Sequence, residues 1–455
     1  MTTVDGEIRL LANCVVGLGF SAAGFRRGLE RHPHLVGCDA GSADFGPGFL
    51  GTGRDSKSPI SVRRDLRIMI EGAHEVGCPV VIGSCGGAGA RSQLLGTADI
   101  VQDILRARGI KANVALVHAD LDRSLLHTAV DEGRTRPLGM FPDLTHDDVE
   151  ASVNIVAMMG AGPITKALDA GADIVLAGRC ADPAIYAAQA MRLGAPAHLA
   201  WHASKCIDKG YLATTEPSAG SPVLATIRAD HFDVEPTKEG ARCTVATVAR
   251  TAMYENADPF LIRQPSGDID VTEARYEQIG DAVRVRGSAF RPASPSVKLE
   301  GARLAGYRSI LLVGMRDPRV LARLDEFLER YEGLLHRIAR SLDIAQGDYR
   351  ILFRSFGRNA VLGDIEPAVD HVPNEIGLVV DVVARTQEIA GAIVGRAAPT
   401  GSRLDVVGGV GSGGNFAYPF SPSSMHLGPV HEWSVWHVMD VRDESEPFSV
   451  ELVEA

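Results

Sequence analysis

The alternation of apolar and polar segments in the first half of the chain predicts strands that alternate with helices. Short apolar runs such as "LLANCVVGLGF" (10–20) and "PVVIGS" (79–84) are typical of buried strands. Between these runs, one face of a predicted helix at 63–77 is formed by Leu66, Met69, Ile70, Ala73 and Val76. Repeated strand–helix units imply a mainly parallel sheet with helices on both faces. We therefore predict a doubly wound α/β domain over residues 1–215.

The pattern changes near residue 222, where short alternating segments separated by polar turns become frequent. The stretch "SPVLATIRADHFDVEP" (221–236) is typical of this β-rich texture, and a long helix is predicted at 318–343. These segments predict a second domain of the α+β class over residues 216–455, with the boundary near 210–225.

The net charge and the cysteines of the sequence indicate which kinds of partner and which cellular compartment to expect. The net charge of −11 over 455 residues argues against nucleic acid or an anionic membrane as the main partner. The N-terminus lacks the pattern of a signal peptide, and no apolar run approaches the roughly 20 residues of a membrane span. The seven cysteines are scattered and form no CxxC pair, which is typical of reduced thiols. We expect a cytoplasmic protein.

Polar side chains follow five successive predicted strands of the first half. In an open parallel sheet, ligands bind beyond the carboxyl ends of the strands. The candidate catalytic residues at these ends are Asp39, Asp44, His118, Asp120 and Asp182. The candidate ligand-binding residues are Ser42, Ser84, Cys85, Gly86, Gly87, Gly89, Arg91 and Arg179. Each of the five groups alone has a structural explanation, since glycines form turns and Asp or Ser caps the next helix, but their shared edge favours an active-site cleft.

The glycine-rich turn "GSCGGAGARS" (83–92) predicts an anion site. Successive backbone N–H groups that lead into a helix form a concave site for a carboxylate or phosphate, and Arg91 adds charge. The turn lacks the lysine of a Walker-type loop, which argues against ATP. A nucleophilic Cys85 would need a lowered thiol pKa, and a structural thiol inside a tight turn explains this residue at least as well.

Two cofactor classes could use the same strand ends. The turn "GLGFSAAG" (17–24), with Asp39 further along the chain, resembles a dinucleotide-binding fingerprint, but its third glycine is irregularly placed. A nicotinamide-dependent oxidoreductase is therefore an alternative rather than the leading hypothesis. The metal-binding patterns HExxH, paired CxxC and the EF-hand loop do not occur. His118 and Asp120, joined by Asp39 or Asp44, could hold a hard divalent ion such as magnesium, but an ordinary hydrogen-bonded His118 is favoured. We predict neither a metal nor a cofactor.

The C-terminal part contributes two further candidates. The segment 411–422 is either a lid over the cleft, with Asn415 as a polar contact, or the approach to a half-buried strand at 430–439. Lys298 and Glu300 in "VKLEGA" either reach the cleft from the second domain or form a surface ion pair.

Several motifs together resemble the acyclic terpene utilisation (AtuA) family over nearly the whole chain. They are "GCDAGSADFGPGFLGTG", "GSCGGAGARSQL", "AGRCADPAIYAA", "IRADHF", "VKLEGARLAGYRSI", "MRDP", "GGNFAYPFSPS" and "GPVHEWSVWHV". The resemblance implies a bacterial catabolic protein, often encoded with enzymes of acyl-CoA and branched-acid degradation. It also implies a small ferredoxin-like partner domain, which we expect here as a separate chain.

The leading hypothesis is a hydratase, lyase or isomerase that acts on a small carboxylic acid or its acyl-CoA thioester. Anion-binding groups next to proton carriers are what enolate chemistry beside a carboxylate requires. The alternative is a non-catalytic subunit that binds a metabolite or docks a partner chain. We expect a homo-oligomer in either case.

Overall fold

The computed structural model describes residues 6–13, 15–43, 45–215, 220–368, 371–408 and 415–454. The chain forms two compact units. The first unit comprises Met1–Arg303 and Trp433–Ala455, and the second unit comprises Leu304–Glu432. This division differs from the boundary expected near residue 215, because the β-rich segments that follow residue 222 extend the sheet of the first unit instead of starting a new domain.

The first unit is built on a ten-stranded mixed sheet with the order β12-β13-β9-β8-β1-β2-β3-β7-β4-β19. The five central strands are parallel: β1 (Ile8–Ala12), β2 (Leu35–Asp39), β3 (Val80–Gly83), β7 (Ile174–Ala177) and β4 (Asn113–His118). The flanking strands are antiparallel: β8 (Val223–Ile227), β9 (Phe232–Pro236), β13 (Ala282–Arg286), β12 (Arg275–Ile279) and β19 (Ser449–Glu454). The predicted α/β class is confirmed, with a sheet that is parallel only in its centre.

Helices pack on both faces of this sheet. One apolar cluster joins the sheet to α1 (Ala22–Leu29), α3 (Pro59–Val76) and α4 (Arg91–Arg108). The other joins it to α7 (Ala161–Asp169), α8 (Ala184–Arg192) and α9 (Ala197–Ile207). Successive strand residues point to opposite faces, so Leu10 and Val81 belong to one cluster while Leu11 and Ile82 belong to the other.

The remaining elements of the first unit surround the sheet. They are α2 (Gly48–Thr52), α5 (Arg123–Asp131), β5 (Thr135–Pro137), α6 (His146–Ala151), β6 (Ser152–Met158), α10 (Val245–Met253), β10 (Leu261–Gln264), β11 (Gly267–Asp270) and β14 (Ala289–Pro292). Strands β10, β11 and β14 form a separate three-stranded sheet. Two long strands, β15 (Ser296–Met315) and β18 (Ser424–Asp440), contain residues of both units. No helix in the described part of the chain has both the length and the hydropathy of a membrane span.

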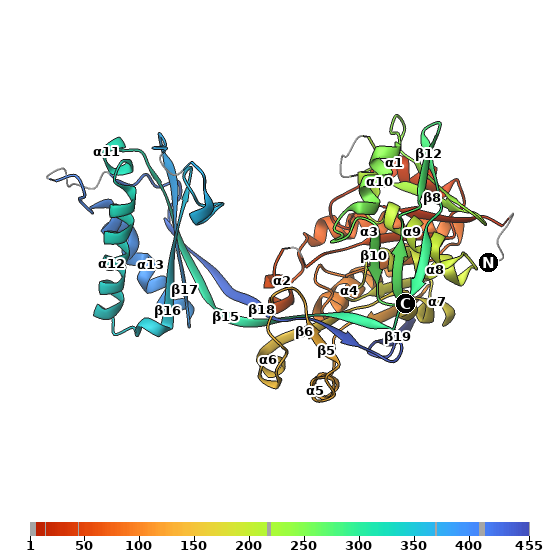
Figure 1. Ribbon diagram of the computed structural model, residues 1–455, viewed down its shortest axis with the longest axis horizontal. Helices are drawn as coiled ribbons and strands as arrows, with labels where there is room; N and C mark the ends of the chain where they lie inside the picture. Colours follow the sequence, from red (N-terminus) through yellow and green to blue (C-terminus); the bar gives the residue numbers. More distant parts are fainter. Residues whose placement is uncertain are drawn as a thin grey trace. The chain divides into compact units, whose positions relative to one another are not determined.

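The second unit has the strand and helix order β-α-β-β-α-β. Its elements are β15, α11 (Pro318–Leu321), α12 (Leu324–Ser341), β16 (Tyr349–Phe356), β17 (Ile376–Ala384), α13 (Gln387–Ser402) and β18. The sheet order β16-β17-β15-β18, with β17 antiparallel to both neighbours, is that of a ferredoxin-like fold. Figure 1 shows α12 and α13 on one side of this sheet, where Phe327 and Tyr331 pack against Leu378 and Val380.

Candidate active site

Asp39 lies at the carboxyl end of β2, inside the first unit. All five residues of β2 are buried, and Asp39 itself is 2% exposed. Its Oδ1 accepts a hydrogen bond from the N–H of Gly41 (3.1 Å). Its Oδ2 lies 3.7 Å from the Nζ of Lys209. The buried strand therefore places a carboxyl group at the edge of the sheet without exposing it to bulk water.

Lys209 lies between two carboxyl groups. Its Nζ is 2.5 Å from the Oδ2 of Asp182 and also faces Asp39. Burial alone would lower the pKa of Lys209, but the charges of Asp182, Asp39 and Asp208 raise it above the ordinary lysine value. The ammonium group is consequently charged at neutral pH. The sequence pattern did not indicate Lys209, because it follows α9 in a stretch ("SKCIDKG") that looks like an ordinary helix end.

The environment of Asp39 raises its pKa to about 7. Burial is the largest cause, and the charge of Asp182 acts in the same direction. Lys209 and the N–H of Gly41 lower the pKa, but they do not offset the burial. Near neutral pH, a carboxyl group with this pKa is protonated in some molecules and ionised in the others. A general acid–base catalyst requires both forms.

Asp39, Asp182 and Lys209 form the Asp39 cluster together with Arg179, Ser84, Glu300 and Lys298. Arg179 connects this cluster to β15. Its Nε and Nη2 donate to the two carboxylate oxygens of Glu300, at 2.9 and 3.2 Å. Burial alone would raise the pKa of Glu300, but Arg179 and Lys298 lower it to about 2. The Nζ of Lys298 lies 2.8 Å from Glu300 and 3.6 Å from the ring centroid of Trp436. Glu300 is 1% exposed, so the surface ion pair is wrong. Glu300 does reach the predicted site residue Arg179, but it does so from within the first unit rather than from a second domain.

Ser84 joins the glycine-rich turn to Arg179. Its Oγ lies 3.4 Å from the Nη1 of Arg179 and 3.4 Å from the backbone N–H of Cys180, both of which donate to it. Ser84 is fully buried and has a φ of 49°, a left-handed conformation that is unfavourable for a residue with a Cβ. Strain of this kind is concentrated at functional sites.

The glycine-rich turn brings the ends of the strands into backbone contact. A Cβ on Gly89 would lie 2.2 Å from the nitrogen of Arg179, and a Cβ on Gly41 would lie 2.1 Å from the Cα of Gly87. The N–H of Gly87 donates to the carbonyl of Ser84 (3.0 Å). Within the described residues, the N–H groups of Gly86 and Gly89 have no hydrogen-bond partner. Binding of an anion by this turn stays a prediction.

Cys85 occupies a structural position. The thiol is fully buried, packs in the cluster beneath α3 and α4, and donates to the carbonyl of Ile82 (3.7 Å). Burial raises the pKa of the Cys85 thiol well above its ordinary value. This is the opposite of what a nucleophilic thiolate needs, so the geometry favours the structural explanation of this residue.

His118 is the last residue of β4 and Asp120 follows that strand; among the described residues, their side-chain contacts do not include Asp39, Lys209 or Arg179. The Nε2 of His118 is 3.2 Å from Glu451 on β19. Arg91 is the first residue of α4, and its backbone N–H donates to the carboxylate of Asp120. Burial raises the pKa of Asp120. The side chain of Arg91 is exposed, and Ser42 is half-buried.

Asn415 and Asp44 were also predicted as site residues. The side-chain amide of Asn415 belongs to the second unit, where it donates to the carbonyls of Leu404 (2.7 Å) and Gly401 (3.3 Å). Asp44 lies outside the described residues, as does most of the glycine run expected to act as a lid. From the predicted set, the structure thus brings together Asp39, Ser84, Arg179 and Asp182 with the glycine-rich turn.

The first glycine turn has a different role from the one a dinucleotide would require. The N–H groups of Gly17 and Gly19 both donate to the Oδ2 of Asp65 on α3, at 2.9 and 3.0 Å. Arg64 pairs with the other oxygen of the same carboxylate. In a dinucleotide-binding fold these N–H groups face the pyrophosphate, but here a carboxylate of the chain itself occupies them.

The stretch 53–58 covers the glycine-rich turn. The N–H of Ser56 donates to the carbonyl of Gly86 (2.9 Å), and the side-chain amide of Gln93 donates to the carbonyl of Arg54 (2.7 Å). The most exposed members of the cluster are Lys298 and Asp182, at 22% and 15% of their side-chain surface. A ligand would therefore approach Asp39 past Asp182 or by displacing this stretch.

Comparison with known proteins identifies one match. The family model of the acyclic terpene utilisation family protein AtuA matches residues 60–205 and 219–412, which is most of the chain. No curated protein and no solved structure matches. The matched ranges include Ser84, Arg179, Asp182 and Glu300.

Proposed function

Because this chain belongs to the acyclic terpene utilisation (AtuA) family, we propose that it is a hydratase, lyase or isomerase of a catabolic route. Its substrate would be a small carboxylic acid or the corresponding acyl-CoA thioester. The observation that carries the proposal is the pKa of Asp39, about 7, beside the buried ammonium group of Lys209. A proton carrier poised at neutral pH next to a fixed cation is suited to proton abstraction beside a carbonyl group.

The geometry supports the following proton cycle for a dehydration. Asp39 accepts the α-proton of the substrate, and negative charge develops on the carbonyl oxygen. Arg179 and the free N–H groups of the glycine-rich turn are the groups that would stabilise that charge. Asp39 then gives the same proton to the departing β-hydroxyl group, which leaves as water, and this restores the carboxylate. The Lys209 ammonium, 3.7 Å from Asp39, stays charged throughout.

The test is turnover by the purified full chain. β-Hydroxyacyl and enoyl thioesters of CoA, and the free acids, would be followed by the ultraviolet absorbance of the conjugated product. Asp39→Asn should lower kcat by about a hundredfold or more, the usual scale for a lost general acid or base. The control is Asp233→Asn. Asp233 lies on β9, outside the Asp39 cluster, and is paired with Arg284 and Arg228. Equal activity of the two variants would refute the role of Asp39.

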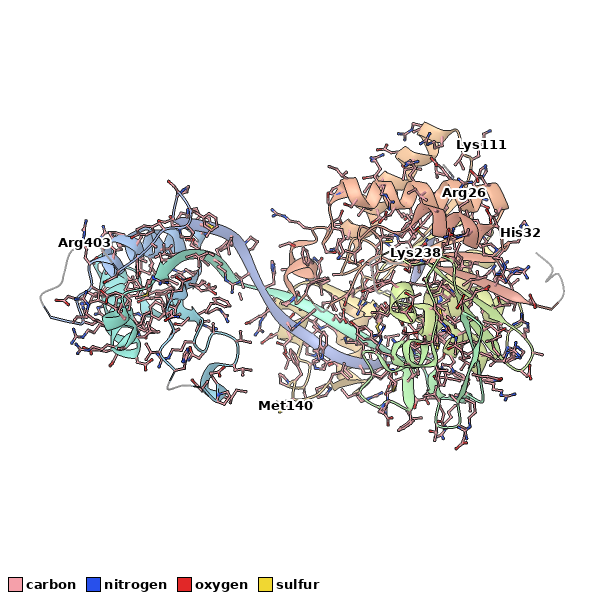
Figure 2. All side chains as sticks on the ribbon, turned by 90° about the horizontal axis from the view of Figure 1, so that it is seen from above. Arg26, His32, Lys111, Met140, Lys238 and Arg403 are labelled. Atoms are coloured by element: carbon pink, nitrogen blue, oxygen red, sulfur yellow. The ribbon has the colours of Figure 1, made fainter. Side chains whose placement is uncertain are left out.

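A second candidate function, a non-catalytic subunit that docks a partner, is favoured by exposed apolar side chains. In the connection between β16 and β17 of the second unit, Val361 is 84% and Ile365 is 79% exposed. In the first unit Met140, between β5 and α6, is fully exposed (Figure 2). Ligand-dependent thermal stabilisation of the full chain without turnover of any thioester would support this candidate.

The third candidate, a nicotinamide-dependent oxidoreductase, would require the pyrophosphate to displace Asp65 from Gly17 and Gly19. Asp65→Asn removes the competing charge from that turn. If the turn binds a dinucleotide, this variant should bind NAD more tightly than the native chain, as measured by fluorescence titration.

A further inference from the structure

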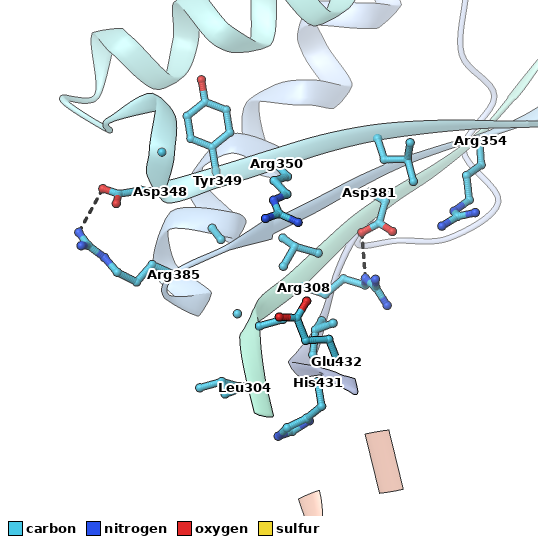
Figure 3. A pocket seen from close by; sticks show the side chains of 17 residues that line it. Leu304, Arg308, Asp348, Tyr349, Arg350, Arg354, Asp381, Arg385, His431 and Glu432 are labelled. Atoms are coloured by element: carbon cyan, nitrogen blue, oxygen red, sulfur yellow. Dashed lines mark hydrogen bonds and ion pairs between the residues drawn. The ribbon is translucent and has the colours of Figure 1, made fainter. Parts of the chain in front are cut away.

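The second unit contains a cavity of about 640 Å³ on the open side of its sheet. Strands β15, β16, β17 and β18 contribute its walls (Figure 3). Tyr349 turns away from the helix-free side, and its hydroxyl lies 2.7 Å from the Nδ1 of His336 on α12. Its neighbour Arg350 points the opposite way, into the cavity. The volume is within the usual range of small-molecule sites.

Four arginines line this cavity: Arg308, Arg350, Arg354 and Arg385. Two of them are fixed by carboxylates. The Nε of Arg308 lies 2.9 Å from Asp381, whose side chain is only 9% exposed, and Arg385 lies 3.1 Å from Asp348 (Figure 3). A third carboxylate, Glu432, also lines the cavity.

The other two arginines, Arg350 and Arg354, have no ion-pair partner among the described residues. Both are on β16 and are exposed, and they point to the same side of the sheet because they are four residues apart. That spacing separates their backbones by about 13 Å. Leu352 lies between them and is 48% exposed. Arg350 lies in the same row of the sheet as Val383 and Arg308.

This arrangement differs from the electrostatics of the rest of the molecule. The chain carries a net charge of −11, yet this cavity is lined by four arginines and only three carboxylates, and Arg350 and Arg354 form no ion pair among the described residues. Like charges gathered in one cavity repel one another, and an anionic ligand removes that repulsion. Guanidinium groups bind phosphate through paired N–H donors. Leu352 and Val383 offer an apolar surface for an uncharged part of the same ligand.

We propose that this cavity is a binding site for an organic phosphate with at least two negative charges. Arg350 and Arg354 bind its anionic groups, and Arg308, held by Asp381, adds a positioned donor. The uncharged body of the ligand covers Leu352 and Val383. The site is complete within the second unit, so it does not depend on the proton chemistry proposed for Asp39.

Isothermal titration calorimetry of the full chain tests the proposal with three probes: inorganic pyrophosphate, ADP and CoA. ADP or CoA should bind with a Kd at least fivefold lower than that of pyrophosphate, because pyrophosphate has no body to cover the apolar surface. The double variant Arg350→Gln/Arg354→Gln should weaken the binding at least tenfold. Leu352→Ser should weaken ADP and CoA but leave pyrophosphate unchanged.

The matched control removes two other exposed arginines of the second unit, Arg337 on α12 and Arg396 on α13. Arg337→Gln/Arg396→Gln changes the net charge equally and should leave each Kd within twofold of the native value. Equal losses in the two double variants would overturn the proposal, since only the general charge would then matter. Absence of binding to all three probes, or tightest binding of pyrophosphate, would overturn it as well. If the double variant at 350 and 354 does not fold, each single variant is measured against the same control.

Discussion

The guanidinium group of Arg179 contacts both carboxylate oxygens of Glu300, at 2.9 and 3.2 Å, and neither side chain is more than 9% exposed. This pair connects the loop after β7 to β15 on the same unit. A buried ion pair is a sensitive position, because the removal of one partner leaves the other charge unpaired in a poorly solvated site.

Glu300→Ala should therefore destabilise the protein by about 3–5 kcal/mol, the range for breaking a buried pair. Urea unfolding monitored by tryptophan fluorescence gives the value. The matched control is Glu273→Ala, because Glu273 forms an exposed pair with Arg275 and exposed pairs contribute about 0–1 kcal/mol. Similar losses in both variants would show that Arg179 is solvated when Glu300 is absent.

The raised pKa of Asp39 makes the stability of the protein depend on pH. The pKa is about 7 in the folded chain, whereas an aspartate in the unfolded chain has the ordinary value of 3.8. The folded state therefore binds more protons between these values. The contribution of Asp39 is fully favourable below pH 4 and is lost as the pH rises to 7, by about 4 kcal/mol. Asp39→Asn lacks this titration, so its free energy of unfolding should rise relative to the native chain across this window. Parallel curves for the two proteins would contradict the assignment.

The left-handed conformation of Ser84 predicts an unusual order of stability. Ser84→Ala and Ser84→Gly both lose the hydroxyl group that contacts Arg179 and Cys180. Only alanine keeps a Cβ at a φ of 49°. The glycine variant should consequently be more stable than the alanine variant by about 1 kcal/mol. Thermal unfolding of the two variants measures the difference, and a more stable alanine variant would show that the turn relaxes.

The contact between Gly89 and Arg179 predicts a large effect of a single methyl group. In Gly89→Ala the new Cβ would meet backbone atoms at 2.2 Å, and the φ of 73° adds strain. We expect a loss of at least about 3 kcal/mol, since backbone atoms cannot move aside as a side chain can. Gly109→Ala is the control, because Gly109 has a φ of 63° with nothing within 4 Å of the added atom. It should cost about 1 kcal/mol.

The sequence predicted part of this site because parallel strands end at one edge of their sheet. Asp39 ends β2, Ser84 follows β3, and Arg179 and Asp182 follow β7. These strands are neighbours in the sheet, so a local pattern was sufficient. Lys209 and Glu300 come from a helix end and from a strand far along the chain. Only tertiary packing brings them to that end of the sheet. The sequence pattern therefore contained no sign of Lys209, and for Glu300 it left a site residue and a surface ion pair as equal alternatives.

The domain boundary was missed for a related reason. Apolar and polar residues alternate along the segment 221–236, and this pattern is the same for a strand that begins a new domain and for one that pairs with β1. In the structure β8 pairs with β1 in antiparallel orientation, so the segment belongs to the first unit. In the second unit the helix predicted at 318–343 is present as α11 and α12. The ferredoxin-like strand order of this unit depends on which strands pair with each other. The sequence pattern predicted strands and helices of the α+β class but did not specify the strand pairing.

The continuity of the second unit within the chain has a consequence for synthesis on the ribosome. Residues 304–432 are complete before the last segment of the first unit has been made. Until Ser449–Glu454 emerges, β4 is an open edge strand in the growing protein, and Lys298 has no Trp436 to cover it. An open edge can pair with other chains. The edge of β4 in the nascent first unit is therefore unpaired during the whole translation of the second unit. A chain truncated before residue 449 has this unpaired edge permanently, and we expect it to aggregate.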